Sequence, residues 1–257
     1  MTSRNPSVSL NLKTSQEGLD PTGPVTVLDH TGVRRGGRAA VEHPLTIRID
    51  GNELITLMTI GTHPECLVIG YLRNQGLIAE PQMIESVTVD WLHEVADVIT
   101  RNGSGIQNVI AGELPNAVPV TPIRVRRSEI YAIVAEIPKW NAIYRLAGSV
   151  HGCGLFEKGE LRYFYEDVGR HNATDALAGQ MWIDGFEGDG TILYSTGRLT
   201  AEIVAKVASM RIPVLISRNG VTYRAVELAR KLNVMLVARA RNKKFDIYSC
   251  HDFLEVD

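Results

Sequence analysis

The last third of the chain alternates short apolar runs with amphipathic segments, and this alternation restricts the fold more than any other feature. Apolar runs at residues 191–195, 213–217 and 234–238 are separated by helix-like segments at 200–210 and 222–232. Continuous apolar strands are typical of sheets covered on both faces, and helical connections join parallel strands. The pattern therefore predicts an α/β fold with a largely parallel sheet between two layers of helices.

The residues before this alternation are expected to add two strands and two helices. Residues 146–156 and 161–167 read as a hairpin. Asn172 is expected to begin the following helix, in which Asp175, three residues on, would complete a variant of the capping box. Ser128 is expected to cap an earlier helix.

The N-terminal half has a different pattern, which indicates a separate small domain. Two strand-like runs within residues 45–60 flank the turn Asp50-Gly51-Asn52. A helix is expected at residues 64–75 and further strands at 86–90 and 95–101. We therefore expect an N-terminal tail at residues 1–38 with at most one short strand, an α+β domain at 39–110, a linker at 111–127 and an α/β domain at 128–257.

Composition excludes several classes of protein. The 257 residues carry a formal net charge of -2, so the whole-molecule field does not favour binding to nucleic acid. No run approaches the roughly 18 apolar residues of a membrane helix, and no signal peptide is recognised. The three cysteines are not spaced as CxxC, which argues against a disulfide framework. We expect a cytoplasmic protein that contacts neither membrane nor nucleic acid.

Each of the four strand ends carries at least one arginine. In open α/β sheets ligands bind beyond the carboxyl ends of the strands, where helix N-termini present free N–H groups. The planar guanidinium of arginine suits phosphate because it binds two oxygens at once. Any one of these arginines could be an ordinary solvated residue, but their coincidence predicts a phosphate-bearing ligand. The arginines are Arg170, Arg198, Arg218 and Arg239 or Arg241.

Several nearby side chains are candidates for chemistry, and each also has a structural interpretation. His171, Glu166 and Asp167 could act as acids or bases, or could simply hydrogen-bond within the fold. Cys153 could be a thiolate nucleophile, or a small core residue. The His63-Pro64-Glu65 sequence matches half of a zinc-deaminase signature, but no PCxxC half is present, so we expect no metal site.

Four blocks of sequence resemble one known family. They are EDVGRHNATD at residues 166–175, STGRLTAEIVAK at 195–206, IPVLISRNGVTYRAVELA at 212–229 and LVARARNKKFDIYS at 236–249. In this order they are similar to blocks of the FdhD family, accessory sulfurtransferases of formate dehydrogenase. The similarity extends over roughly residues 40 to 110 and 125 to 250.

The resemblance implies a fold, a ligand and partners. The α/β domain would be a cytidine-deaminase-like, zinc-free, cofactor-binding domain, usually in a homodimer. The ligand would be the molybdenum cofactor, bis-molybdopterin guanine dinucleotide. The partners would be formate dehydrogenase or a related molybdoenzyme, and a cysteine desulfurase as the sulfur donor. The cofactor-binding residues carried over are His151, Arg170, His171, Asn172, Gly197, Arg198, Ser217, Thr222, Arg239, Ala240, Arg241, Asn242, Lys243 and Lys244.

Departures from the family pattern leave the activity open. The family carries sulfur on a CxxC pair between its two domains, whereas residues 102–122 of this chain contain no cysteine. Ala176 replaces a typical lysine, and Arg239 replaces a typical aromatic residue. The chain could thus support cofactor sulfuration and insertion with Cys153 as its sulfur-carrying thiol, or act as a carrier alone. Alternatives are a non-catalytic guanine-nucleotide-binding scaffold or regulator, and a nucleotide hydrolase or transferase.

Overall fold

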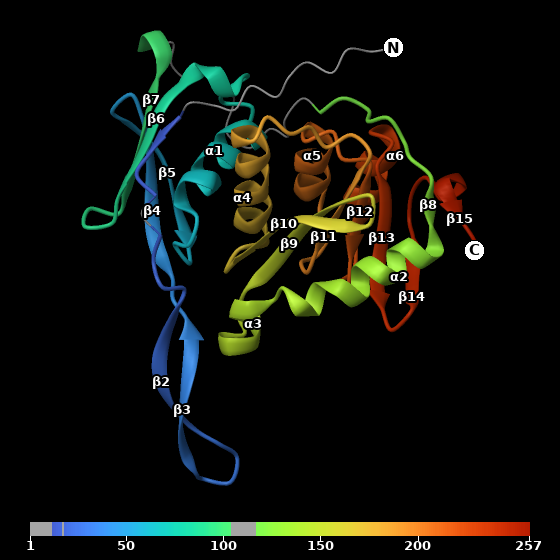
Figure 1. Cartoon of the computed structure of the whole chain (residues 1–257), viewed down its shortest axis with the longest axis horizontal. Coiled ribbons are helices and arrows are strands. Elements are labelled where there is room, and N and C mark those ends of the chain that lie inside the picture. The colour runs from blue at the N-terminus through green and yellow to red at the C-terminus, as the bar shows by residue number, and fades with distance from the viewer. Residues whose placement is uncertain (1–11, 17, 104–116) are drawn as a thin grey trace.

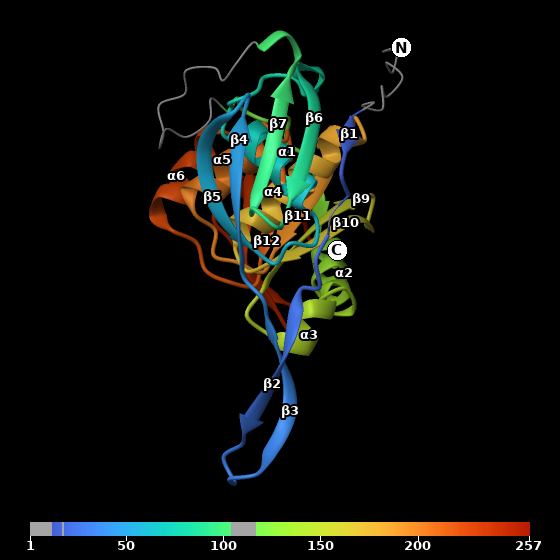
Figure 2. The same ribbon diagram turned by 90° about the vertical axis from the view of Figure 1, so that its left-hand side faces the viewer.

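The structure, a computed structural model, describes residues 12–16, 18–103 and 117–257. Two sheets stand on either side of a packed helix pair, and a narrow two-stranded ribbon projects from one end of the molecule (Figure 1). Figure 2 shows the same ribbon from the side, extending well beyond both sheets. Within the described ranges, no helix is long and apolar enough to cross a membrane.

The C-terminal sheet has six strands in the order β10-β9-β11-β12-β13-β14. The strands are β9 (His151–Glu157), β10 (Glu160–Asp167), β11 (Thr191–Ser195), β12 (Val214–Ser217), β13 (Met235–Arg241) and β14 (Lys244–Ile247). Only the pairs β11–β12 and β12–β13 are parallel, whereas the other three pairs are antiparallel. The prediction of a largely parallel sheet was therefore wrong, because β9 is also antiparallel to β11 and the unpredicted strand β14 is antiparallel to β13. The hairpin of β9 and β10 was predicted correctly. Tight turns with positive φ at Lys158 and Gly159, and at Asn242 and Lys243, return the chain antiparallel at the two outer pairs.

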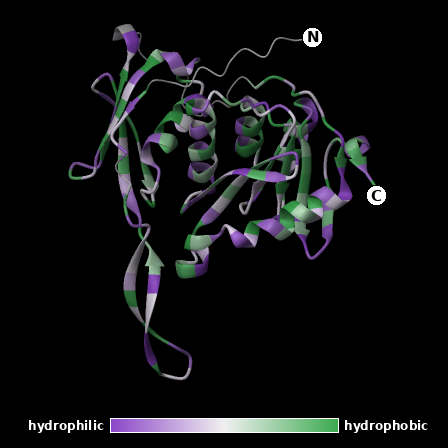
Figure 3. Ribbon diagram, in the orientation of Figure 1, coloured by the Kyte–Doolittle hydropathy of each residue, from purple (hydrophilic) through white to green (hydrophobic). Residues whose placement is uncertain are grey.

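Helices cover this sheet on both faces, as its continuous apolar strands predicted. On one face, α4 (Arg170–Ile183), α5 (Ala201–Ser209) and α6 (Tyr223–Lys231) pack on Leu193, Leu215 and Leu236. On the other face, α2 (Arg127–Glu136) packs on alternate residues of the same strands, such as Ile216 and Val237. Figure 3 shows these central strands as the most continuously hydrophobic part of the chain.

The N-terminal sheet is small and carries one helix. Its order is β1-β6-β7-β4-β5. The strands are β1 (Lys13–Thr14), β4 (His43–Ile49), β5 (Asn52–Thr59), β6 (Ile84–Asp90) and β7 (Val95–Thr100). The helix α1 (Pro64–Asn74) packs against it through Val68, Ile69 and Leu72. The hairpin, the helix and both later strands were predicted correctly, because each has a clear apolar period.

The two halves meet where α1 crosses α4, and two glycines allow the close approach. A Cβ on Gly70 would lie 1.7 Å from the carbonyl oxygen of Asp175, and one on Gly179 would lie 1.9 Å from that of Cys66. Any larger side chain at either position would push the helices apart. The N-terminal sheet is thus fixed directly on the helix that begins at the predicted anion site.

The segment expected to be a tail forms most of the projecting ribbon. Its strands β2 (Thr22–Leu28) and β3 (Arg34–Ala40) pair along their full length. Asp29 shapes the turn between them, since its Oδ1 accepts hydrogen bonds from the backbone N–H groups of Thr31 and Val33. The prediction of at most one short strand was wrong because β3, which contains two consecutive glycines, lacks the alternating apolar pattern of a half-buried strand.

Other local predictions also fail, each because a tertiary contact or a break in the backbone decides the structure. Residues 142–147, which include the predicted strand start, form the short helix α3 (Ala142–Ala147), and positive φ at Gly148 and Ser149 separates it from β9. The N-cap of α2 is Arg126, not Ser128. The hydroxyl of Ser128 instead donates a hydrogen bond to the carboxylate of Asp257. Within the predicted linker, β8 (Val125–Arg126) pairs with β15 (Leu254–Glu255).

The predicted capping box of α4 is also wrong. The helix begins at Arg170 with Gly169 as its N-cap, and Asn172 and Asp175 make long-range contacts instead of capping it. Short 3-10 turns complete the described structure at Pro81–Met83, Arg101–Gly103, Ile137–Lys139 and His251–Phe253. The division into domains and the cytidine-deaminase-like topology stay predictions.

Candidate functional site

One edge of the C-terminal sheet collects nearly all of the predicted site residues. β10 and β11 are both antiparallel to β9, so they run in the same direction as β12 and β13. Their carboxyl ends therefore share one edge with the amino end of β9. The register confirms this, because Asp167 pairs with His151 and Ser195 pairs with Ser217.

The loops at this edge are held together by their own polar groups. The hydroxyl of Ser217 donates to the carbonyl of Gly197 at 2.6 Å, and the side-chain amide of Asn219 donates to the carbonyl of Thr196 at 2.6 Å. A short parallel bridge joins Leu199 to Val221. The two loops form one rigid support, in which Ser217 has a structural role and is fully buried.

Arg170 lies across the support because Gly197 makes room for it. A Cβ on Gly197 would come within 2.6 Å of Cδ of Arg170, so the arginine stem occupies the place of a side chain. The Nε atom of Arg170 is buried without a hydrogen-bond partner. Burial first, and then the positive charge of Arg198, lower the pKa of Arg170. This guanidinium thus retains an unused donor beside a second cation.

His151 lies next to the same cations. Its Nδ1 is 3.2 Å from the hydroxyl of Thr196. Burial lowers the pKa of His151, and the positive charges of Arg170, Arg218 and then His171 lower it further. The structure therefore brings His151, Arg170, Arg198, His171 and Arg218 into one electrostatic group, which we call the cationic group. An anion bound there would favour the protonated form of His151.

The cationic group has very little negative charge of its own. None of Arg170, Arg198 and Arg218 forms an ion pair with a carboxylate in the described part of the chain. His171 has one acidic neighbour, since its Nδ1 lies 3.2 Å from Oε1 of Glu202. The cations of this group repel one another at close range, and the repulsion is relieved when an anion binds between them. Their clustering is local, because the protein as a whole has a net charge of -2.

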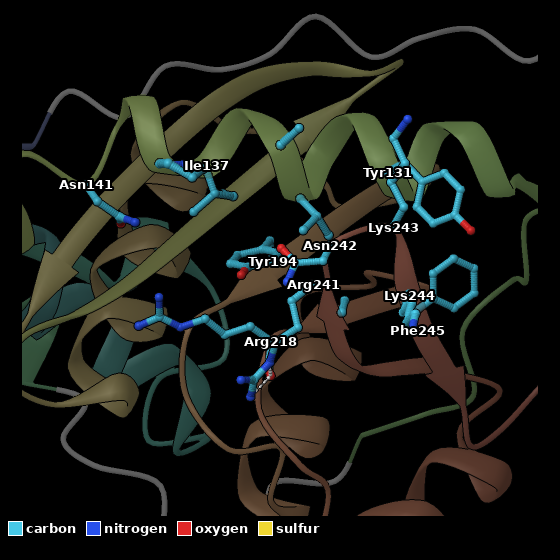
Figure 4. A pocket seen from close by; sticks show the side chains of 14 residues that line it. Tyr131, Ile137, Asn141, Tyr194, Arg218, Arg241, Asn242, Lys243, Lys244 and Phe245 are labelled. Atoms are coloured by element: carbon cyan, nitrogen blue, oxygen red, sulfur yellow. Dashed lines mark hydrogen bonds between the residues drawn. The ribbon is translucent and has the colours of Figure 1, made fainter.

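A cavity of about 380 Å³ opens beside the cationic group, between α2 and the β13–β14 turn. Figure 4 shows Tyr194 at its centre, with Arg218 and Arg241 on one side and Tyr131 and Phe245 on the other. Arg241 donates to the carbonyl of Arg218 through Nε at 3.3 Å and Nη2 at 3.0 Å. Apolar rings with two guanidinium groups at one side suit a ligand that has both a flat ring and phosphates.

The predicted stretch from Arg239 to Lys244 lines this cavity and a shallower neighbouring one. Ala240 is buried and Arg241, Asn242, Lys243 and Lys244 are exposed around the first cavity. Arg239 lines the neighbouring cavity, and its Nη1 lies 3.8 Å from Asp246. The sequence thus grouped two adjacent surfaces, which share Arg241, Asn242 and Lys244, whereas Arg218 lines only the first cavity.

Two further predicted residues have structural tasks. The amide of Asn172 donates to the carbonyl of Met58 at 2.7 Å and to Asp167 at 2.9 Å, so it joins α4 to the N-terminal sheet. The hydroxyl of Thr222 accepts from the backbone N–H of Ala225 and caps α6. Both residues shape the edge through these contacts.

The two carboxylates considered as acid or base are engaged elsewhere. Glu166 accepts hydrogen bonds from the backbone N–H groups of Ile143 and Tyr144, at 2.8 and 3.0 Å, and so closes the start of α3. Asp167 accepts from Thr59, Gly169 and Asn172. Burial raises the pKa of Asp167 even though these bonds oppose the shift. Their geometry gives no support to acid–base catalysis on a nucleotide.

The three cysteines lie within the described residues, and none has the environment of a reactive thiol. Cys153 is fully buried under α4, and burial raises its pKa to about 12. The thiol of Cys66 donates to Gln180 at 3.3 Å, and burial raises its pKa to about 12 as well. Burial also raises the pKa of Cys250. Because the thiolate is the nucleophile, these environments disfavour sulfur transfer through a cysteine.

Among the described residues, no group of three or more His, Cys, Asp or Glu side chains could hold a metal ion. Sequence reasoning missed Glu202, Thr196, Tyr194 and Asn141, which lie at the edge or line the cavity. Only Glu202 carries a local signal, as an acidic residue in the first turn of a helix after a predicted strand end. The other three are revealed by the packing alone.

The fold defines a mixed α/β protein with a second, smaller sheet, and its strand ends gather cationic side chains beside a cavity lined partly by aromatic rings. Comparison with known proteins makes the assignment specific. A sequence model of the FdhD/NarQ family matches residues 40–254, and the chain belongs to this family.

Two curated relatives illustrate how far the similarity extends. The chain is 28% identical over 246 residues to the sulfur carrier protein FdhD of Shouchella clausii, covering 87% of this chain and 92% of the relative. It is 27% identical over 231 residues to the sulfur carrier protein FdhD of Bacillus subtilis, covering 82% and 88%. These alignments include both halves of the molecule.

A solved structure supports the same assignment. A crystal structure from Desulfotalea psychrophila, provisionally described as a formate dehydrogenase accessory protein, superposes with a TM-score of 0.79 and 25% sequence identity. The match covers 91% of this chain and 98% of that one. The arrangement of the two sheets is therefore shared with a relative of known structure.

Proposed function

We propose that this protein is a formate dehydrogenase accessory protein that binds the phosphates of bis-molybdopterin guanine dinucleotide at the cationic group. The observation that carries the proposal is the unpaired state of Arg170, Arg198 and Arg218 in the described structure, together with the buried, unused Nε of Arg170. The family relationship supports the client, since relatives are sulfur carrier proteins FdhD and a neighbour is described as a formate dehydrogenase accessory protein.

The proposed role is to hold the cofactor and pass it to the client, not to carry sulfur on a thiol of this chain. The environments of Cys66, Cys153 and Cys250 all raise the thiol pKa, so little thiolate would form near neutral pH. Sulfur would then reach the bound cofactor from a separate donor, such as a cysteine desulfurase. The family resemblance further supports a homodimer in the cytoplasm as part of this proposal.

Arg198 offers the clearest test because it is exposed and makes no contact that the fold needs. Arg198→Ala should weaken binding of guanosine diphosphate by about tenfold to a hundredfold, as expected for loss of a charged hydrogen bond, when measured by isothermal titration calorimetry. The matched control is Arg230→Ala. Arg230 is an exposed arginine in the last turn of α6, at the end of the helix far from the strand ends, and this variant should bind guanosine diphosphate as tightly as the wild type. Equal binding by Arg198→Ala and wild type would refute the site.

A second measurement tests delivery and separates the proposal from a mere nucleotide-binding scaffold. In cells that lack their own accessory protein, the wild-type chain should restore formate dehydrogenase activity and Arg198→Ala should not. Restoration by a triple variant in which Cys66, Cys153 and Cys250 are all alanine would support a role without a thiol carrier. Failure of the wild type to restore activity, despite tight nucleotide binding, would favour the scaffold.

A further inference from the structure

Glu202 is the one carboxylate of the described residues that lies within 4 Å of a nitrogen of the cationic group, and its contact with His171 is an ion pair when the imidazole is protonated. It lies in the first turn of α5, directly after the loop that carries Gly197 and Arg198. Its Oε1 is 3.2 Å from Nδ1 of His171, and its negative charge also acts on Arg170. A fixed anion inside a site for anions needs an explanation beyond the stability of the helix.

Lys206, the other neighbour of Glu202, does not require its charge. The ammonium of Lys206 is buried and lies 2.9 and 2.7 Å from the two carboxylate oxygens of Asp175. Its distance from Glu202 is longer, at 3.7 Å. Asp175 already neutralises Lys206, so the charge of Glu202 is directed outward to the cationic group. The longer contact with Lys206 helps to hold the Glu202 carboxylate in place but does not neutralise its charge.

A simpler role for Glu202 is also present and predicts a different outcome. A carboxylate in the first turn of a helix stabilises it, because the free N–H groups there carry partial positive charge. If this were its whole role, removing the charge would lower stability and leave ligand affinity unchanged or weaker. Glu129 also lies in the first turn of its helix, α2, and forms no ion pair with the cationic group among the described residues, so it provides a matched control.

We infer that Glu202 competes with the anionic group of the ligand for the cationic group and thereby limits affinity so that the ligand can be released. In the structure the carboxylate lies against His171, and its charge acts on Arg170. A bound phosphate takes over part of these contacts and also meets the repulsion of Glu202. This inference rests on the proposed function, since a protein that passes on its cofactor must not bind it too tightly.

Calorimetry with inorganic pyrophosphate and with guanosine diphosphate tests this inference on the full-length protein. Glu202→Gln keeps the shape and removes the charge, and should tighten binding of both ligands about three- to tenfold, as expected for one unit charge a few ångströms away when water screens a half-exposed side chain. The gain should shrink as salt increases, because exposed charges are screened. Guanosine, which has no charge, should bind both proteins equally.

Three variants make the result specific. Glu129→Gln should not change affinity. Glu202→Asp, which keeps the charge, should bind close to the wild type. In a His171→Asn background, Glu202→Gln should gain less, because part of the competition acts through His171. Thermal unfolding of each variant verifies the fold, and Glu202→Ser replaces Glu202→Gln if that variant does not fold.

A gain of affinity for pyrophosphate when the charge of Glu202 is removed is the outcome that distinguishes competition from a structural role. Unchanged or weaker pyrophosphate binding by a folded Glu202→Gln protein would overturn the inference and leave the proposed function intact. Absence of binding by the wild type itself would overturn the proposed site, and the inference with it.

Discussion

Two charged regions along a single helix differ in how their charges are compensated. At the start of α4, Arg170 and His171 belong to the cationic group, in which the three arginines have no carboxylate partner among the described residues. Farther along the same helix, Asp175 is fully buried and receives hydrogen bonds from both Lys206 and Asn74. The region around Asp175 is buried and its charges are paired, whereas the region around Arg198 is open to solvent and its arginines have no carboxylate partner.

The difference separates structural charge from binding charge. Taking an ion out of water costs several kcal/mol, so a buried charge persists only with a partner in close contact. At the sheet edge water reaches at least part of each arginine side chain, apart from the buried Nε of Arg170, so cations without a carboxylate partner are tolerated there. The pair Asp175–Lys206 therefore joins α4 to α5, and the arginines without a carboxylate partner are where we propose that a ligand binds.

Removing Lys206 should have the largest effect of the changes considered, because it leaves Asp175 buried and unpaired. Lys206→Met should lower the free energy of unfolding by about 3–5 kcal/mol, the usual cost of breaking a buried ion pair from one side. Chemical denaturation followed by circular dichroism measures it. The surface variant Lys139→Met, which breaks the exposed pair with Glu136, should leave stability nearly unchanged.

A double variant tests whether the unpaired charge causes this loss. Lys206→Met combined with Asp175→Leu should recover part of the stability, because no buried charge remains. If Lys206→Met were as stable as the wild type, the contrast between paired and unpaired regions would have no energetic basis.

The central part of the fold could be predicted from the sequence because its signals are local. The apolar runs of β11, β12 and β13 and the periods of α1, α5 and α6 each lie within one segment, and all six elements were found. β14 was missed because Lys244–Ile247 is a short strand with a mixed pattern, paired only through its turn. Of the ribbon, one short strand at Val25 to Leu28 was expected and lies within β2, whereas β3 was missed because an exposed strand has no reason to alternate.

The site was predictable only as a coincidence of residue types at strand ends. Four arginines at four junctions predicted one shared edge, and the topology does bring those junctions together. The roles of individual residues could not be predicted in the same way. Asn172 and Ser217 have the polar side chains that a ligand site needs, but their partners, Met58 and Gly197, are distant in sequence. Glu202 was missed because its contact with His171 is likewise long-range.

A substitution at Cys153 tests whether this buried side chain has only a structural role. The thiol is enclosed under α4 beside Thr174, whose hydroxyl lies 3.8 Å from the sulfur. Cys153→Ala should cost about 1 kcal/mol of stability, as for an ordinary small core deletion. Cofactor delivery in cells should be unaffected once the temperature is low enough to keep the variant folded. Loss of delivery by a folded Cys153→Ala protein would restore the thiol as a functional group.

The smallest expected effect concerns the protonation of His151 on the exposed side. Burial and nearby cations lower its pKa in the folded protein, so the unfolded chain binds more protons as the pH falls past the ordinary histidine value of about 6.5. His151 therefore contributes stability above that pH and loses it below. Sulfate, which does not titrate in this range, should bind among the cations and raise the pKa of His151.

Nuclear magnetic resonance titration of the imidazole with and without saturating sulfate measures this shift. His151→Asn assigns the signal and should itself bind sulfate without proton uptake from this position. The shift should be a few tenths of a pKa unit, because sulfate offsets only the smaller, charge-related part of the lowering and burial remains. An unchanged pKa at saturating sulfate would place the anion away from His151, and would divide the cationic group into binding and non-binding parts.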